Sequence, residues 1–296
     1  MTMRQITLVS TDAGPGHNCG LALGLEKYGK LTVVWENKNP HGLDYFYKAK
    51  YGYRHIPKYG DDLVVVGALC FDRIRNMSLQ YNRKHIVITD GRFARYPEKY
   101  NHLLRGWDVI TTACKRHFRE PLPVKTYYQP FDLSHIDSTK NKVLTVGHSP
   151  FGEMKFREKG TEHIIETCAD LGVNLDLITG VSWQQCLKRK AKCHIFVDQI
   201  DHYDRHKFKI RSGYVWPALG KSGLEALHLG CCVITYGKGY DTDIPAPPVA
   251  WCRDNFRAVL EICIKNEKER NELSKAGKAW ALQFANYEFA AEQVLK

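Results

Sequence analysis

The sequence lacks the features that mark membrane, secreted and zinc-binding proteins. No apolar run reaches the roughly 18 residues that a membrane-spanning helix needs. The segment from Met1 to Ser10 contains Arg4 and reads as a strand, not as a signal peptide. The 10 cysteines are scattered and none forms a C-x-x-C pair, which argues against a zinc site and a disulfide framework. We interpret them as reduced core thiols of a cytoplasmic protein.

The sequence offers little support for a dinucleotide cofactor or for a bound metal ion. The turn from Asp12 to His17, after the first predicted strand, contains Gly14 and Gly16 but not the G-x-G-x-x-G fingerprint, so NAD is not supported. The letters D-x-D occur only at residues 241–243, in a loop rich in glycine and proline and not directly after a strand. We therefore expect no metal site and no required cofactor.

The composition is that of a globular protein with a strong positive charge. A chain of 296 residues forms one large domain or two of ordinary size, and 44% apolar and 25% charged residues are typical of soluble proteins. The net charge of +11 favours an anionic partner, which is a nucleotide, a nucleic acid or an anionic membrane surface. The sequence does not indicate an oligomeric state.

Strand and helix patterns divide the chain into two α/β halves of similar size. Short continuous apolar runs alternate with helical patterns, as in parallel sheets that are buried on both faces. The polar, turn-prone segment 130–141 separates the halves, so we expect domains at 1–135 and 136–280. Loops that follow parallel strands collect ligands, so a cleft between the domains is expected. The strands are expected near residues 3–10, 31–35, 63–69, 85–89, 107–112, 124–128, 142–147, 174–179, 194–198, 231–234 and 249–252.

The segment from Arg211 to Thr235 carries the strongest functional signal. A glycine-containing loop leads into a short helix with Glu225, and a buried strand follows. Amides at a helix N-terminus attract phosphate, and a carboxylate accepts hydrogen bonds from both ribose hydroxyls. Together these features would hold a sugar nucleotide. The same pattern also fits an ordinary αβ unit in which Glu225 is solvated or caps the helix.

Several motifs of the second half resemble the donor domain of retaining GT-B glycosyltransferases, a group that includes glycogen synthases and many bacterial mannosyl- and glucosyltransferases. The resemblance implies an α/β fold of two Rossmann-like domains that face each other across a cleft, with a C-terminal helix, within 281–296, that crosses back to the first domain. The motifs are VGHSP at 146–150, KGTE at 159–162, AKCHIFVDQ at 191–199, GLEALHLGCCVI at 223–234, the linker QPFD at 129–132 and the closing helix at 285–295.

The resemblance also implies residue roles. Glu225 would hold the ribose, Lys159 would meet the donor phosphates with Arg157 beside it, and Gly223 and Leu224 would offer backbone amides to the pyrophosphate. The second carboxylate that the family often carries eight residues before Glu225 is replaced by Pro217. The complete donor-binding prediction comprises Gly14, Gly16, His148, Arg157, Lys159, Arg211, Gly223, Leu224 and Glu225.

The predicted catalytic residues are Asp12, His17, Asp90 and Lys159. In a retaining transfer the leaving phosphate takes the acceptor proton, so the family mechanism requires no strong enzymic base. His17 also fits a structural hydrogen-bonding role, Asp90 fits a cap of the turn at Gly91, and His148 has the same two interpretations.

The acceptor is predicted from the first half, where the family binds it. Residues 45–59 alternate tyrosines with lysines and an arginine, a pattern in which aromatic rings stack on bases and cations meet phosphates. One hypothesis is DNA with hydroxymethylated pyrimidines, as phage glycosyltransferases use, with a UDP- or GDP-sugar as the donor. Another is an anionic lipid or envelope glycan at a membrane surface. A solvated basic surface, or a non-catalytic nucleotide- or nucleic-acid-binding protein of the same fold, fits the pattern as well.

Overall fold

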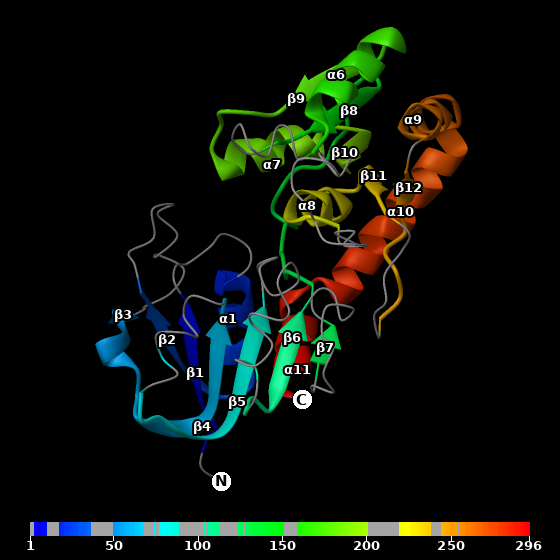
Figure 1. Cartoon of the computed structure of the whole chain (residues 1–296). Helices are drawn as coiled ribbons and strands as arrows, with labels where there is room; N and C mark the ends of the chain where they lie inside the picture. Colours follow the sequence, from blue (N-terminus) through cyan, green and yellow to red (C-terminus); the bar gives the residue numbers. More distant parts are fainter. Residues whose placement is uncertain are drawn as a thin grey trace, which may run out of the picture. The chain divides into compact units, whose positions relative to one another are not determined.

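The computed structural model describes two compact units, each with its own parallel sheet (Figure 1). The first unit comprises Met1–Asp132, Asp241–Pro245 and Phe284–Lys296, and the second comprises Leu133–Tyr240 and Ala246–Gln283. The described residues are 3–10, 18–36, 50–67, 74, 77–88, 104, 106–112, 124–126, 128–150, 159–200, 219–237, 244–253 and 255–296. Among them, no helix combines the length and the apolar character that crossing a bilayer requires.

The sheet of the first unit has seven strands in the order β3-β2-β1-β4-β5-β6-β7. This order reverses between β1 and β4, as in doubly wound nucleotide-binding folds. Successive side chains of β1 point to opposite faces of the sheet, so Leu8 packs in one hydrophobic cluster and Val9 in another. The strands are β1 Gln5–Ser10, β2 Lys30–Trp35, β3 Lys50–Tyr51, β4 Tyr59–Val66, β5 Gln80–Ile88, β6 Val109–Thr112 and β7 Val124–Thr126.

Two helices from opposite ends of the chain share one core with this sheet. Helix α1 (Asn18–Glu26) packs against α11 (Tyr287–Leu295), and both contribute buried side chains to the cluster that contains Leu8. The contact is close, because a Cβ atom on Gly24 would lie 2.1 Å from the carbonyl oxygen of Tyr287. The C-terminal helix therefore belongs to the first unit.

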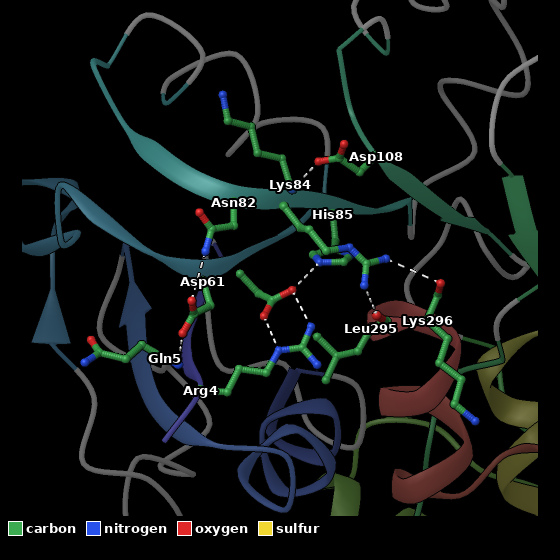
Figure 2. A network of polar contacts seen from close by, with 11 residues as sticks. Arg4, Gln5, Asp61, Asn82, Lys84, His85, Asp108, Leu295 and Lys296 are labelled. Carbon is green, nitrogen blue, oxygen red and sulfur yellow. Dashed lines mark hydrogen bonds and ion pairs between the residues drawn. The ribbon is translucent and has the colours of Figure 1, made fainter. Parts of the chain in front are cut away.

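A partly buried polar network links β1, β4 and β5 of this sheet (Figure 2). Asp62 accepts hydrogen bonds from Nε and Nη2 of Arg4, at 2.5 and 2.7 Å, and its Oδ1 lies 2.8 Å from Nε2 of His85. Beside it, Nη1 of Arg83 donates to the carbonyl oxygen of Leu295 at 2.7 Å. Asp62 therefore connects the start of β1 and the middle of β5 to β4, and Arg83 connects β5 to the end of α11.

The second unit has a five-stranded parallel sheet in the order β12-β11-β10-β8-β9. Its core contains apolar side chains from the central strands and from helices α6 and α9. The strands are β8 Thr145–His148, β9 Asn174–Leu177, β10 Ile195–Gln199, β11 Cys232–Tyr236 and β12 Ala250–Cys252. The helices are α6 Thr161–Asp170, α7 Trp183–Ala191, α8 Lys221–His228, α9 Phe256–Lys265 and α10 Glu267–Phe284.

The expected strands occur within a few residues of their predicted positions, with two differences. Strand β3 and the short 3-10 helix η2 (Tyr53–His55) lie in a segment where no strand was expected, because a strand of two residues paired with β2 gives no apolar run in the sequence. His148 lies just beyond the expected strand at 142–147 but is the last residue of β8, where it pairs with Val197 of β10 and with Leu177 of β9.

Candidate functional site

The strand order of the second unit locates a ligand site. The chain runs from β8 outward to β9 and then returns to the other side of β8 as β10, so the order reverses between β8 and β10. In open α/β sheets, ligands bind beyond the carboxyl ends of the strands at this reversal. Ser149 follows β8, and Asp198 and Gln199 end β10.

Lys159 bridges these two strand ends. Its Nζ lies 3.2 Å from Oδ1 of Asp198 and 3.4 Å from the carbonyl oxygen of Ser149. The side chain is 15% exposed. Gly160 follows with φ 70°, a left-handed conformation that glycine adopts without steric cost, and helix α6 begins at the next residue. The sequence thus places an ammonium group at the reversal point and turns the chain sharply into α6.

Asp198 connects Lys159 to the start of helix α8. The aspartate is fully buried, and its Oδ2 accepts a hydrogen bond from the backbone N–H of Gly220 at 2.6 Å. Added Cβ atoms would lie 2.9 Å from Oδ2 of Asp198 at Gly220, and 3.0 Å from Cγ of Asp198 at Gly223. Gly220 is therefore required by the close approach of the helix start to this carboxylate, whereas at Gly223 the nearest atom to the added Cβ is Cδ1 of Leu219 at 2.4 Å.

The first turn of α8 presents backbone amides. The N–H of Leu224 donates to the carbonyl oxygen of Gly220 at 3.0 Å, so this predicted phosphate ligand is used inside the helix. The three preceding helical residues, Lys221 to Gly223, belong to the first turn, where an α-helix has no internal acceptor for its N–H groups. The positive end of the helix dipole lies at the same place.

Glu225 is neither solvated nor a helix cap, which removes the alternative that the sequence left open. Its side chain is 3% exposed, and the residue that caps α8 is Gly220. Its Oε1 accepts from Nε1 of Trp183 at 2.8 Å, and its Oε2 lies 2.5 Å from Nζ of Lys190. Burial alone would raise the pKa of Glu225, but the nearby Lys190 and Lys221 cations hold it below its ordinary value.

Lys190 and Trp183 complete this buried group. The Lys190 side chain is 1% exposed, and its ammonium also lies 5.1 Å from the ring centroid of Phe196. Lys221 lies over the Trp183 ring at 5.7 Å. Helix α7 begins at Trp183, and the preceding residue, Ser182, caps it by forming a capping box with Gln185. The cap thus fixes the start of the helix that carries both partners of Glu225.

His148 is a fully buried hydrogen-bonding residue. Its Nδ1 lies 2.7 Å from the carbonyl oxygen of Val197, which only accepts, so Nδ1 carries the proton. Nε2 then accepts from Oγ1 of Thr161 at 2.9 Å. Burial, reinforced by the Lys159 cation, lowers the pKa of His148 to about 4. Both ring nitrogens are engaged within the unit, so the imidazole links β8, β10 and α6 and has no free nitrogen for a ligand.

The structure brings five predicted site residues into the second unit: His148, Lys159, Gly223, Leu224 and Glu225. Asp198, Trp183 and Lys190 were not predicted. A carboxylate at the end of a central strand was a usable signal for Asp198, whereas Lys190 stood in a basic run that reads as a solvated face. The other predicted residues lie outside the described part of the chain: Asp12, Gly14, Gly16, His17, Asp90, Arg157 and Arg211, as do Pro217 and the D-x-D letters at 241–243.

Within the described ranges, no group of three or more histidine, cysteine, aspartate or glutamate side chains is arranged to hold a metal ion. Eight cysteines lie in these ranges and all are free thiols: Cys19, Cys168, Cys186, Cys193, Cys231, Cys232, Cys252 and Cys263.

Comparisons with known proteins identify the fold. No protein-family model and no curated protein matches the sequence. An alpha-glucosyltransferase solved with UDP and a 13-mer DNA containing an HMU base matches with a TM-score of 0.60 and 11% identity, over 99% of this chain and 98% of that one. Anabaena HepE, solved with UDP and glucose, matches with a TM-score of 0.64 and 11% identity, over 98% of each chain.

Sucrose-phosphate synthase from Thermosynechococcus elongatus matches with a TM-score of 0.58 and 11% identity, over 98% of this chain and 97% of that one. Identities this low establish the architecture alone, and these matches extend over almost the whole chain. The two parallel sheets with their helices and these structural neighbours agree on one conclusion: the chain has the GT-B fold, an α/β architecture of two Rossmann-like domains.

Proposed function

We propose that the protein is a glycosyltransferase that moves a sugar from a nucleoside diphosphate sugar to an acceptor hydroxyl. One arrangement carries the proposal. Lys159 is bonded to Asp198, Asp198 is bonded to the first residue before α8, and α8 carries Glu225. An ammonium group, the amides of a helix N-terminus and a fixed carboxylate therefore belong to one connected set, and these groups suit a diphosphate and a ribose.

The chemistry follows from the charge on the leaving group. As the glycosidic bond breaks, the diphosphate gains negative charge, and the transition state resembles an oxocarbenium ion. Lys159 and the first turn of α8 stabilise that charge, and one charge-assisted contact contributes about 1.5–3 kcal/mol. Because the leaving phosphate itself takes the acceptor proton in a retaining transfer, the protein needs to supply orientation and cations more than a base.

The remaining roles complete this proposal. Glu225 accepts from the ribose hydroxyls. Further donor contacts come from Gly14, Gly16, Arg157 and Arg211, and acceptor-side contacts come from Asp12, His17 and Asp90. His148 and Leu224 hold β8 and α8 in place instead of touching the ligand, because their polar groups are bonded within the unit. Residues 1–135 bind the acceptor, 136–280 bind the donor, and 281–296 return to the first domain.

UDP-glucose is the first donor to test, with DNA that carries hydroxymethylated pyrimidines as the first acceptor. One structural neighbour was solved with UDP and DNA and another with UDP and glucose, and the net charge of +11 suits a polyanionic acceptor. The second candidate acceptor is an anionic lipid or envelope glycan, which the same positive charge favours.

The test is a donor panel followed by an acceptor panel. Calorimetry with UDP-, GDP- and ADP-sugars identifies the donor, and mass spectrometry then follows its transfer to hydroxymethylated DNA, unmodified DNA and anionic lipid or glycan acceptors. We expect one donor to bind, to be hydrolysed slowly alone and to be transferred to a hydroxylated acceptor. Binding of none of these sugars would remove the enzyme proposal, and absence of DNA binding near ~50 mM salt, where phosphate-driven binding is strong, would remove the DNA acceptor.

A further inference from the structure

One buried carboxylate serves both phosphate-binding features of the second unit. Asp198 is fully buried, with Oδ1 facing the Lys159 ammonium at 3.2 Å and Oδ2 accepting from the Gly220 amide at 2.6 Å. A Cβ at Gly220 would lie 2.9 Å from Oδ2 of this carboxylate, so the carboxylate itself requires glycine at the residue before α8. The buried carboxylate thus restricts the residue at the start of α8 and holds both the Lys159 ammonium and a backbone amide of that start.

Within the described part of the chain, the Lys159 ammonium has two acceptors and one donor to spare. An ammonium group has three N–H donors. Asp198 takes one and the Ser149 carbonyl oxygen takes a second at 3.4 Å, and among the described residues the ammonium has no third acceptor. The side chain keeps 15% of its surface exposed, whereas Asp198 keeps none. Two bonds, from the end of β10 and from the residue after β8, therefore orient the ammonium, and among the described residues one donor remains for an external anion.

We propose that Asp198 is a positioning residue for the diphosphate site: one oxygen orients the Lys159 ammonium and the other fixes the start of α8, so that both act on the same nucleoside diphosphate. This inference rests on the proposed function, because it assigns Lys159 to the leaving diphosphate. It adds that Asp198 acts on turnover through Lys159 without touching the substrate itself.

The test is a double-mutant cycle. Asp198→Asn keeps the shape and an oxygen for the Gly220 amide but presents an uncharged group to Lys159. We expect Asp198→Asn and Lys159→Ala each to lower kcat by about 10- to 100-fold, the range that one charge-assisted contact spans. The combined variant is expected to be no slower than Lys159→Ala alone, because residues that act as a unit are not additive. The assay measures release of UDP from UDP-glucose, or of the corresponding nucleotide from the donor that calorimetry selects.

The matched control is Asp176→Asn, which makes the same change in the partly exposed Asp176–Arg189 pair of the same unit. We expect it to leave kcat within about threefold of the wild type, since partly exposed ion pairs contribute little. Asp198→Ser, which can still accept from Gly220, replaces Asp198→Asn if that variant does not fold.

The outcomes separate this inference from the proposed function. Multiplying effects in the combined variant, or an unchanged kcat in Asp198→Asn, would overturn the positioning role while leaving the transferase intact. Loss of the fold in both Asp198 variants, with Lys159→Ala still folded, would assign Asp198 to the structure of α8 alone and would also overturn it. A wild-type protein that binds no nucleotide sugar removes the proposed function itself and this inference with it.

Discussion

The Lys190 ammonium lies 2.5 Å from the Glu225 carboxylate, and both side chains are almost completely buried. A buried ion pair is weak support for stability, since well-packed apolar residues in its place are often neutral or stabilising. Here the carboxylate also accepts from Trp183, so each of its oxygens has one fixed donor. With these described donors, each oxygen keeps a further lone pair, which is what two ribose hydroxyls would need. The ion pair with Lys190 therefore keeps Glu225 ionised and in one orientation.

The apolar replacement of this pair separates stability from binding. Lys190→Met alone leaves Glu225 buried and unpaired, so we expect it to lower the free energy of unfolding by about 3–5 kcal/mol. The double variant Lys190→Met/Glu225→Leu is expected to recover most of that loss in urea unfolding but not the affinity for UDP measured by calorimetry. If the double variant bound UDP as the wild type does, the pair would be purely structural.

The network around Asp62 predicts a dependence of stability on acid. Burial alone would raise the pKa of Asp62, but hydrogen bonds from His85 and Arg4 hold it below its ordinary value. A lowered pKa in the folded state stabilises the protein above the unfolded value, and this contribution disappears as the pH falls through the folded value. The carboxylate therefore contributes fully at neutral pH and progressively less below about pH 4.

The corresponding variant is Asp62→Asn, with Asp61→Asn as its neighbour control. Asp61 is on the same strand and accepts only exposed hydrogen bonds, from the Gln5 amide and from Asn82. We expect Asp62→Asn to destabilise the protein by roughly 3 kcal/mol at pH 7, as for a broken buried pair, and by less at pH 3. Urea unfolding at the two pH values gives the comparison. An equal loss at both values would mean that the charge of Asp62 does not matter.

The sequence predicted the architecture better than the chemistry of the site. Short apolar runs marked nearly every strand, and the run at 231–234 placed the start of β11 to within one residue, because these signals are local. Lys190 could not be identified in this way. It follows Lys188 and Arg189 on α7, and only the packing of α7 against α8 makes it buried and pairs it with a residue 35 positions away.

His148 illustrates the same limit. As a histidine next to a predicted loop it was a ligand candidate, since nothing local distinguishes an exposed imidazole from one held by distant partners. Its partners are Thr161 and the Val197 carbonyl oxygen, the latter 49 positions away. Side-chain exposure and long-range pairing decide whether such a residue binds a ligand, and both are properties of the folded chain.

The lowered pKa of His148 predicts a loss of stability in mild acid. The unfolded chain binds a proton on this imidazole below about pH 6.5, whereas the folded chain does not until about pH 4. Acid therefore favours the unfolded state across this interval, by about 2 kcal/mol at pH 5 relative to neutral pH. His148→Gln removes the titrating group, so its stability should fall less than that of the wild type between pH 7.5 and pH 5. An equal loss of unfolding free energy in the two proteins between pH 7.5 and pH 5, measured by urea unfolding, would contradict the assignment.

Gly24 allows α1 and α11 to pack closely within the first unit. A Cβ at this position would meet the Tyr287 carbonyl oxygen at 2.1 Å and the Cβ of Ala291 at 3.0 Å, so α1 and α11 must separate in Gly24→Ala. Overpacking of this kind costs about 1–3 kcal/mol. We expect faster amide hydrogen exchange in α11, with exchange in the β10 and β11 strands of the second unit unchanged as the internal control. Unchanged exchange in α11 would show that the helix contact relaxes without loss.

The two central site residues should affect different kinetic constants. Glu225 is proposed to meet the ribose, which is unchanged between substrate and transition state, so Glu225→Ala should raise KM and the dissociation constant for UDP with a smaller effect on kcat. Lys159 is proposed to meet the phosphate that gains charge as the bond breaks, so Lys159→Ala should chiefly lower kcat, by about 10- to 100-fold.

Steady-state kinetics with the selected donor measure both effects. Arg257→Ala, which removes an exposed ion pair with Asp170 in the same unit, is the control. If both variants kept wild-type constants, the connected set of Lys159, Asp198 and α8 would not be the donor site. If both variants lowered kcat and left KM unchanged, Glu225 would act on the reacting centre and not on the ribose.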